Sequence, residues 1–474
     1  MKIQLVFVVL VVLLLAFYAA FIQDYDTITR TQAGYATFIV MLGALPGVVS
    51  LLDRREAGLT PLMPLHGLFY ALAFGLPVYS SLTVWRISDS DAITDTLVLT
   101  ILGLICLYVG YYAFRRHFSR LRPIQFLHDV PPGQQVRLAW ILYGMYLLLQ
   151  FVPELTSLPS VGQLTAPLGY LSLGILFALA LNKALPKEQR FLLTAAIVLT
   201  FMIKLLSGSL AGPVFLLVFL GVLYWNKKRT IPWHFLLISV LVAILLNPVK
   251  SVYRELTWYS DPASQSYLDK ALLFYQAGED YYTGNDTYSL VSEDASTISR
   301  IAHIALFGYV INMTPEPVPY WRGGSYATLW TSFIPRIFWL DKPRATIGQE
   351  FGHRYYLLGD EDESTSINLP WLPEFYANFG TLGVLGGMFA VGMLFRFLVQ
   401  KFNAPISRSI EYVLGITITF SLFYAESNFA LTVGGLFLTY VAFVVLLRHM
   451  TTGSAPTGSR QLQETRQETR QEAR

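Results

Sequence analysis

Apolar runs of about 17 to 25 residues recur along this chain of 474 residues, and they constrain its fold more than any other feature. Runs of this length can cross a bilayer as helices, whose backbone hydrogen bonds are satisfied without water. Charged residues make up 14% of the chain, well below the roughly 25% that is usual in soluble domains. The pattern therefore predicts an all-α polytopic membrane protein.

About twelve transmembrane helices are expected from these runs, and the first is expected to be a retained helix rather than a cleaved signal peptide. One long polar stretch separates the ninth from the tenth. The chain thus divides into an N-terminal bundle of about nine helices (1–248), a large, partly helical loop (249–375), C-terminal transmembrane helices (376–448) and a flexible tail (449–474). The expected spans lie near 3–22, 34–52, 62–84, 96–114, 136–152, 166–182, 190–206, 210–226, 232–248, 376–399, 410–425 and 429–447.

Basic and acidic residues alternate from one connecting loop to the next. Basic residues follow every second span, for example Arg54, Arg115 and Lys227, whereas Asp89 and Glu154 lie in alternate loops. Because cytoplasmic loops are enriched in Lys and Arg, this alternation predicts that both termini and the tail are cytoplasmic and that the large loop lies outside.

The large loop carries two stretches with helical periodicity, Tyr267–Ala277 and Thr297–Ile311, which we expect to form amphipathic helices. The acidic run Gly359–Ser366 is expected to be a solvated turn, with a divalent-ion site as the alternative. The chain's one cysteine, Cys106, lies in an apolar run and is expected to be a buried apolar residue, so no intrachain disulfide forms. The sequence indicates no metal and no cofactor, and a net charge of +3 is too small to argue for nucleic acid.

A cluster of cations is the first candidate site. Arg336, Lys342 and Arg344 lie within nine positions, among aromatic residues, and Arg300 precedes them. Pro335 and Pro343 restrict the backbone on both sides of the cluster. Guanidinium and ammonium groups on a stiff, aromatic platform suit a phosphate group. The alternative is an ordinary interfacial loop, whose cations lie near lipid headgroups.

Glu374 and Asn378 are the second candidate site, because they lie four residues apart on one helical face where the chain re-enters the membrane. A partly desolvated glutamate can act as a general base toward a hydroxyl group. A favourable interaction with the helix dipole is the structural alternative for Glu374. Gly383 and Gly387 have the spacing of packing residues.

Lys204 is a charged residue within the seventh expected span, where it either serves function or extends to the nearby outer surface. The expected spans lack the series of buried Asp, Glu and His residues of proton-coupled transporters. Aromatic residues of the loop, among them Trp321, Trp330 and Trp339, exceed what an interfacial belt needs. They suit either sugar rings or the core of a folded loop.

The order of these motifs resembles the Wzy-type oligosaccharide repeat-unit polymerases, also called O-antigen polymerases. The resemblance covers roughly residues 290–395 and rests on Arg300, GGSYATLWTSFIPR (323–336), FWLDKP (338–343), Gly348 with Phe351, and PEFYANFGTLG (373–383). One departure is that members often carry an Arg after a Gly-Ser pair in a short outer turn. Here that turn reads Ser207-Gly208-Ser209-Leu210-Ala211, and Lys204 is the expected substitute.

The resemblance implies a glycosyltransferase at the outer face of the bacterial inner membrane, which joins oligosaccharide repeat units carried on a polyprenyl diphosphate. A chain-length regulator and a flippase are its expected partners. Arg336, Lys342 and Arg344 would hold the diphosphate with Arg300 nearby, and Glu374 would be the base. Tyr326, Tyr376 and Asn378 would contact the glycan. The leaving diphosphate needs cations more than acid catalysis.

Three other functions remain open on the sequence. An O-antigen ligase would use the same donor with a lipid-core acceptor. A transporter or flippase of lipid-linked glycans would need cations along a path through the bundle. A non-catalytic envelope assembly protein would use the loop as a docking surface.

Overall fold

Regular structure in the described part of the chain is helical throughout, as the all-α prediction requires. The computed structural model describes residues 28–53, 60–79, 90–127, 130–156, 158, 161–258, 266–283, 301–336, 338–342, 346–405 and 408–452. The expected first span at 3–22 and the tail from 453 onward therefore lie outside the described residues.

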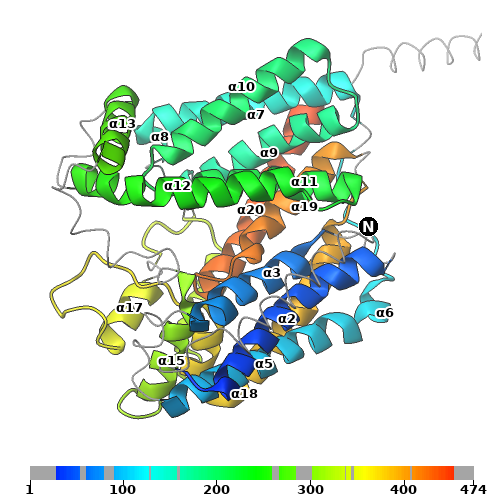
Figure 1. Cartoon of the computed structure of the whole chain (residues 1–474). Coiled ribbons are helices and arrows are strands. Elements are labelled where there is room, and N and C mark those ends of the chain that lie inside the picture. Colours follow the sequence, from blue (N-terminus) through cyan, green and yellow to red (C-terminus); the bar gives the residue numbers. More distant parts are fainter. Residues whose placement is uncertain are drawn as a thin grey trace, which may run out of the picture.

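The long helices form two groups (Figure 1). The first group contains α2 (Arg30–Leu52), α3 (Leu62–Tyr70, continued by Ala71–Gly75 and Leu76–Tyr79), α5 (Ser90–Ala113) and α18 (Trp371–Phe402). The second contains α7 (Pro132–Phe151), α9 (Gly162–Leu181), α10 (Lys187–Leu205), α11 (Ala211–Lys228) and α12 (Trp233–Trp258). Helix α19 (Ser409–Thr419, continued by Phe420–Phe423) contacts α9 of one group and α18 of the other, and α20 (Phe429–Thr452) follows it.

Seven of the described helices are long and apolar enough to cross a membrane, which makes this a multi-pass membrane protein. They occur in α2, α3 with its continuation, α5, α9, α12, α18 and α20. Helices α7, α10, α11 and α19 also occupy expected spans, but each falls short of the same criterion in length, hydropathy or charge. A count of twelve spans thus stays a prediction.

Small residues set the closest contact in the first group, between α5 and α18. A Cβ atom added to Gly110 would collide with the backbone carbonyl of Phe389, and one added to Gly392 would collide with that of Leu107. Without side chains at these positions the two backbones approach closely, which favours helix association in lipid.

Helix α18 is not one straight span, because it reverses at Gly380. That residue has φ +61° and ψ −148°, a backbone conformation open only to glycine. A Cβ atom on Gly387 would lie 2.6 Å from the ring of Phe375, although twelve residues of straight helix would separate them by about 18 Å. Trp371 likewise contacts Phe395, with ring centroids 6.0 Å apart. Residues 371–379 therefore form a short arm that folds back along the long arm, residues 381–402.

This hairpin confirms the packing role of Gly383 and Gly387, although their partner is the short arm rather than a separate helix. The long arm alone is still long enough to span a bilayer. The expected span at 376–399 thus begins within the short arm and crosses the reversal.

The two helices expected in the large loop lie on the left side of the molecule in Figure 1. Helix α13 (Tyr267–Thr283) packs against the end of α12, and α15 (His303–Met313) packs against α5 and α18. Both expected amphipathic helices are thus confirmed, apart from residues 297–300, which lie outside the described part. Helix α12 runs to Trp258, ten residues beyond the expected end of its span. The short helices are α6 (Arg115–Phe118), α8 (Pro153–Thr156), α16 (Ala327–Ser332), α17 (Ile347–Arg354) and the 3-10 turn η4 (Gly324–Tyr326).

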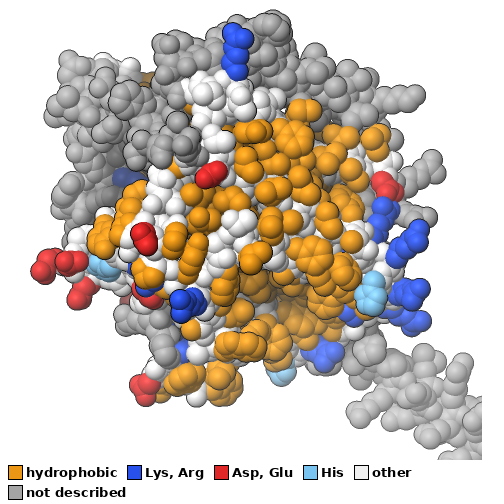
Figure 2. Space-filling model, turned by 90° about the horizontal axis from the view of Figure 1, so that it is seen from below, with side chains coloured by type: hydrophobic (Ala, Val, Ile, Leu, Met, Phe, Trp, Pro, Cys, Tyr) orange, Lys and Arg blue, Asp and Glu red, His pale blue; other side chains and the backbone are white. Residues whose placement is uncertain are grey.

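The surface of the first group fits a lipid environment. Figure 2 shows a broad apolar area over the middle of this face, with the largest groups of charged side chains toward its left and right margins. Such an apolar area would be costly in water and is favourable against acyl chains.

Candidate functional site

Glu374 lies on the short arm of the hairpin and is fully buried. Its Oε1 atom accepts a hydrogen bond from the Ser325 hydroxyl (2.7 Å), and its Oε2 atom accepts one from the backbone N–H of Phe429 (2.6 Å). Phe429 is the first residue of α20, so the carboxylate faces the N-terminus of that helix, where a negative charge is favourable. Glu374 thereby joins three segments that are far apart in the sequence.

Asn378, also fully buried, connects the same segments. Its side-chain amide donates to the Ser325 hydroxyl (2.9 Å) and to the Glu374 carbonyl (2.8 Å), and its Oδ1 atom accepts from the Gly323 N–H (2.9 Å). The spacing of four residues does place Asn378 and Glu374 together. Every polar atom of the Asn378 side chain is occupied within the protein, which favours a positioning role.

The loop Tyr320–Tyr326, called the docking loop below, satisfies the backbone of the hairpin. The backbone N–H of Trp321 donates to the Ala377 carbonyl (2.9 Å), and that of Arg322 donates to the Asn378 carbonyl (3.1 Å). These carbonyls end the short arm, where no further helical turn supplies N–H groups to donate to them. The docking loop therefore replaces the hydrogen bonds that the reversal at Gly380 removes.

Tyr326 and Tyr376, the predicted glycan contacts, lie in the same region. The ring of Tyr326 packs against Phe375, Phe379 and Phe429, and its buried hydroxyl has no hydrogen-bond partner among the described residues. Tyr376 is half-buried between Phe307 and Tyr320. The structure thus brings Glu374, Asn378 and Tyr326 together inside the protein, whereas Tyr376 contacts Phe307 and Tyr320 instead.

Arg336 and Lys342 form a second feature on the segment Phe333–Lys342, called the cation segment below. The Arg336 Nη1 atom donates to the Lys342 carbonyl (2.7 Å), and the Lys342 Nζ atom donates to the Ile334 carbonyl (3.0 Å). These two bonds close the segment into a loop. Partial burial, together with the positive charge of Arg336, lowers the pKa of Lys342. The loop is therefore a place of positive potential, where an anion would be stabilised.

The cation segment also exposes large apolar side chains. Phe338 is 82% exposed and Leu340 is 72% exposed, and Trp330 on the preceding α16 is 77% exposed. Helix α16 packs on α20, which is one of the membrane-spanning helices. Cations and apolar side chains are thus presented together beside lipid.

No described contact brings the other three predicted cations to the cation segment. Arg300 and Arg344 lie outside the described residues. Lys204 ends α10 in the other helix group, where its ammonium group lies over the ring of Tyr170, 4.9 Å from the centroid. The turn that follows it is closed by Arg254, whose Nε atom donates to the Gly208 carbonyl (2.7 Å).

Sequence analysis did not single out a pair of titratable residues, His303 and Glu426, outside the seven spans. The His303 Nε2 atom lies 3.8 Å from the Glu426 Oε1 atom. Burial lowers the pKa of His303 to about 4 and raises the pKa of Glu426. The imidazole is thus neutral at neutral pH. Glu426 lies in a short loop between two expected spans, and no local motif connects it to a histidine 123 positions earlier.

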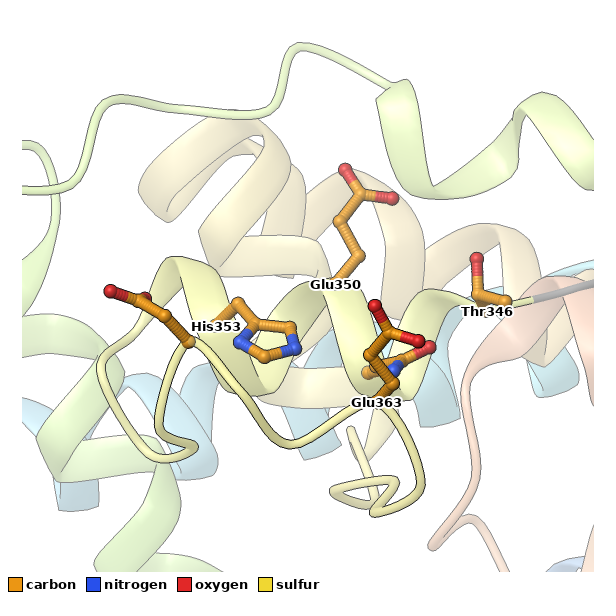
Figure 3. A pocket seen from close by; sticks show the side chains of 6 residues that line it. Thr346, Glu350, His353 and Glu363 are labelled. Carbon is orange, nitrogen blue, oxygen red and sulfur yellow. The ribbon is translucent and has the colours of Figure 1, made fainter.

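An open cavity of about 570 Å³ lies between α17 and the acidic run Gly359–Ser366 (Figure 3). It is lined by Thr346, Gln349, Glu350, His353, Asp360 and Glu363. Three acidic side chains make this cavity unsuitable for a diphosphate. The described residues contain no group of three or more His, Cys, Asp or Glu residues that could hold a metal ion, so the divalent-ion alternative gains no support.

The acidic run itself forms an ordered, solvated turn. The Asp362 carboxylate accepts hydrogen bonds from the backbone N–H groups of Ser364 (3.0 Å) and Thr365 (2.9 Å). A side-chain hydrogen bond from Thr365, together with these backbone bonds, lowers the pKa of Asp362 to about 2. The Asp362 carboxylate therefore has a structural role in the turn that needs no ligand.

A family model described as a domain of unknown function (DUF8712) matches residues 87–454. The match covers more than three quarters of the chain and includes the hairpin, the docking loop and the cation segment. No curated protein and no solved structure matches the chain significantly.

Proposed function

The chain belongs to that family, DUF8712, and we propose that it is a membrane glycosyltransferase that polymerises oligosaccharide repeat units carried on a polyprenyl diphosphate. The observation that carries this proposal is the cation segment. Arg336 and Lys342 lie on one closed loop with exposed Phe338 and Leu340, beside a membrane-spanning helix. A lipid diphosphate combines the same two chemistries, an anionic head and an apolar tail.

The proposed reaction transfers the growing glycan from its lipid diphosphate to a hydroxyl of the next lipid-linked unit. The bond between the anomeric carbon and the diphosphate oxygen breaks, and a bond to the acceptor oxygen forms. Arg336 and Lys342, with Arg344, would stabilise the charge on the departing diphosphate, because preorganised cations act most strongly where charge develops in a water-poor site. The acceptor proton goes to a base.

Glu374 remains our prediction for that base, and Glu426 is the carboxylate with which it can be compared. Both Glu374 oxygens accept hydrogen bonds and the residue is fully buried, whereas the side chain of Glu426 is 23% exposed. If Glu374 is the base, Glu374→Gln abolishes transfer while the protein stays folded, and Glu426→Gln transfers normally. Normal transfer by Glu374→Gln would leave the carboxylate with its structural role alone.

The remaining features of the proposal follow from the charge pattern and from the family resemblance. They are twelve spans, cytoplasmic termini, a periplasmic loop, a place in the bacterial inner membrane, and a chain-length regulator and a flippase as partners. The alternatives are an O-antigen ligase and a transporter or flippase of lipid-linked glycans.

The direct test uses purified protein in proteoliposomes with a polyprenyl-diphosphate-linked repeat unit as the only substrate. We expect a ladder of polymer on the carrier lipid. Arg336→Ala and Arg344→Ala should abolish chain growth without loss of protein from the membrane. Lys270→Gln is the matched control, because it removes a cation from α13 without touching the cation segment.

Two other outcomes would exclude the polymerase, and a third would exclude the role of its cations. A ligase would form no ladder and would transfer the glycan only when a lipid-core acceptor is added. A flippase would move the substrate across the bilayer without joining units. Full-length ladders from both arginine variants would remove the proposed role of the cations.

A further inference from the structure

The segment from Tyr326 to Phe333 runs along α20 toward the middle of that membrane-spanning helix. Tyr326 contacts Phe429, the first residue of α20, with ring centroids 6.2 Å apart. Farther along, a Cβ atom on Gly434 would lie 2.6 Å from the Ser332 Cβ atom, and Phe333 contacts Phe437 at 5.5 Å. Eight residues of α-helix correspond to about 12 Å, so the cation segment begins about that far from the start of α20.

The exposed side chains of this region continue the lipid-facing surface of α20. On α20 itself, Leu431 is 55% exposed and Phe437 is 49% exposed. Beside them lie the exposed Trp330, Phe338 and Leu340. Side chains of this size on adjacent segments would be costly in water. Their chemistry matches that of the neighbouring spanning helix.

Several polar groups of the cation segment are satisfied within it, which lowers the cost of insertion into lipid. The backbone N–H groups of Phe338, Trp339 and Lys342 donate to the carbonyls three residues earlier, at 3.0 to 3.2 Å. The Lys342 and Ile334 carbonyls accept from the cationic side chains of Arg336 and Lys342. A loop that faced only water would not need the second set of bonds.

We propose that residues 327–336 and 338–342 belong to a re-entrant, membrane-inserted element whose apolar side chains contact the acyl chains of the bilayer beside α20. Arg336 and Lys342 then lie at the boundary between headgroups and hydrocarbon, where long cationic side chains can reach phosphate groups. This surface is continuous with the exposed face of a spanning helix, which is why bilayer lipid is the occupant rather than a protein partner.

The test places a nitroxide label at single cysteines in a Cys106→Ser background, in proteoliposomes. Positions Phe338 and Leu340 are compared with Val445, 63% exposed on α20, and with Glu361, exposed on the acidic turn. We expect labels at 338 and 340 to be accessible to oxygen and shielded from a water-soluble nickel chelate, as at 445. Nickel accessibility equal to that at 361 would overturn the proposal. Exclusion of both reagents would also overturn it and would indicate a protein partner or a second copy.

A second measurement needs no substitution. A photoactivatable fatty acid in the bilayer should label peptides covering 330–340 of the unmodified chain as strongly as those covering 431–445, and the acidic run 359–366 weakly. Labelling of 330–340 at the level of the acidic run would contradict the insertion. Neither experiment uses a transfer assay, so this proposal can fail while the proposed function holds, and the reverse.

Discussion

Gly434 should determine how closely α16 and the cation segment approach α20, and Gly434→Ala tests this contact. A Cβ atom at position 434 would lie 2.6 Å from the Ser332 Cβ atom and closer still to the Ser332 hydroxyl. Overpacking of this kind typically costs about 1 to 3 kcal/mol. The next residue is a matched control, because a Cβ atom on Gly435 has no heavy atom within 4 Å.

Gly435→Ala should be neutral or stabilising by about 0.5 to 1 kcal/mol, since alanine is the better residue in a helix. The two variants should thus differ by about 1 to 3 kcal/mol in the free energy of unfolding, the cost of overpacking, because both gain the same helix propensity. Circular dichroism during titration with sodium dodecyl sulfate measures that difference. A nitroxide at position 340 should also become more mobile in Gly434→Ala and not in Gly435→Ala.

A double-variant cycle identifies the cause. Ser332→Gly removes both atoms that would collide, so Gly434→Ala combined with Ser332→Gly should recover most of the lost stability. Equal stability of Gly434→Ala and Gly435→Ala, or no recovery in the double variant, would refute the close contact between α16 and α20.

Three further predictions concern the hairpin and the cations. Glu374→Ala leaves the Ser325 hydroxyl and the Phe429 N–H without an acceptor, so it should lower the free energy of unfolding by about 2 to 5 kcal/mol. The control Glu361→Ala, on the exposed acidic turn, should leave the stability unchanged. Equal losses of stability in the two variants would contradict the buried contacts of Glu374. Gly380→Ala should cost about 1 to 3 kcal/mol for its backbone conformation alone, whereas Gly386→Ala has open space; similar stability of the two would argue against the reversal. Arg336→Gln should raise the lowered pKa of Lys342, because it removes a neighbouring positive charge that repels the Lys342 ammonium group. Lys342 is acylated once it has lost its charge, so its acylation rate, followed by mass spectrometry, should increase only at higher pH in this variant. An unchanged profile of rate against pH would show that the two cations do not interact.

The helical class and the membrane character follow from apolar run lengths, because a helix that satisfies its own backbone is nearly the only solution in lipid. The expected helices at 267–277 and 297–311 follow from periodicity in the same way. Hydropathy could not reveal the reversal at Gly380, since PWLPEFYANFG is apolar enough to join the span that follows. Only the positive φ of one glycine separates the two arms.

Local spacing predicted that Glu374 and Asn378 share one helical face, and it grouped Arg336 with Lys342, but it did not predict the loop that these two cations close. It could not predict the partners of those pairs. Ser325 and Phe429 lie 49 and 55 positions from Glu374, and His303 lies far from Glu426. Contacts of this kind depend on how the helices pack.

The buried carboxylate of Glu374 imposes an order on assembly. Its first donor, Ser325, is synthesised before it and its second donor, the Phe429 N–H, well after it. Until α20 arrives, the carboxyl group of Glu374 has a single donor. The close fit of hairpin, docking loop and α20 is therefore completed only by the last helix to leave the ribosome among those described. A chain released before Phe429 should therefore lack a settled arrangement at this junction, even though most of its residues are already in the membrane.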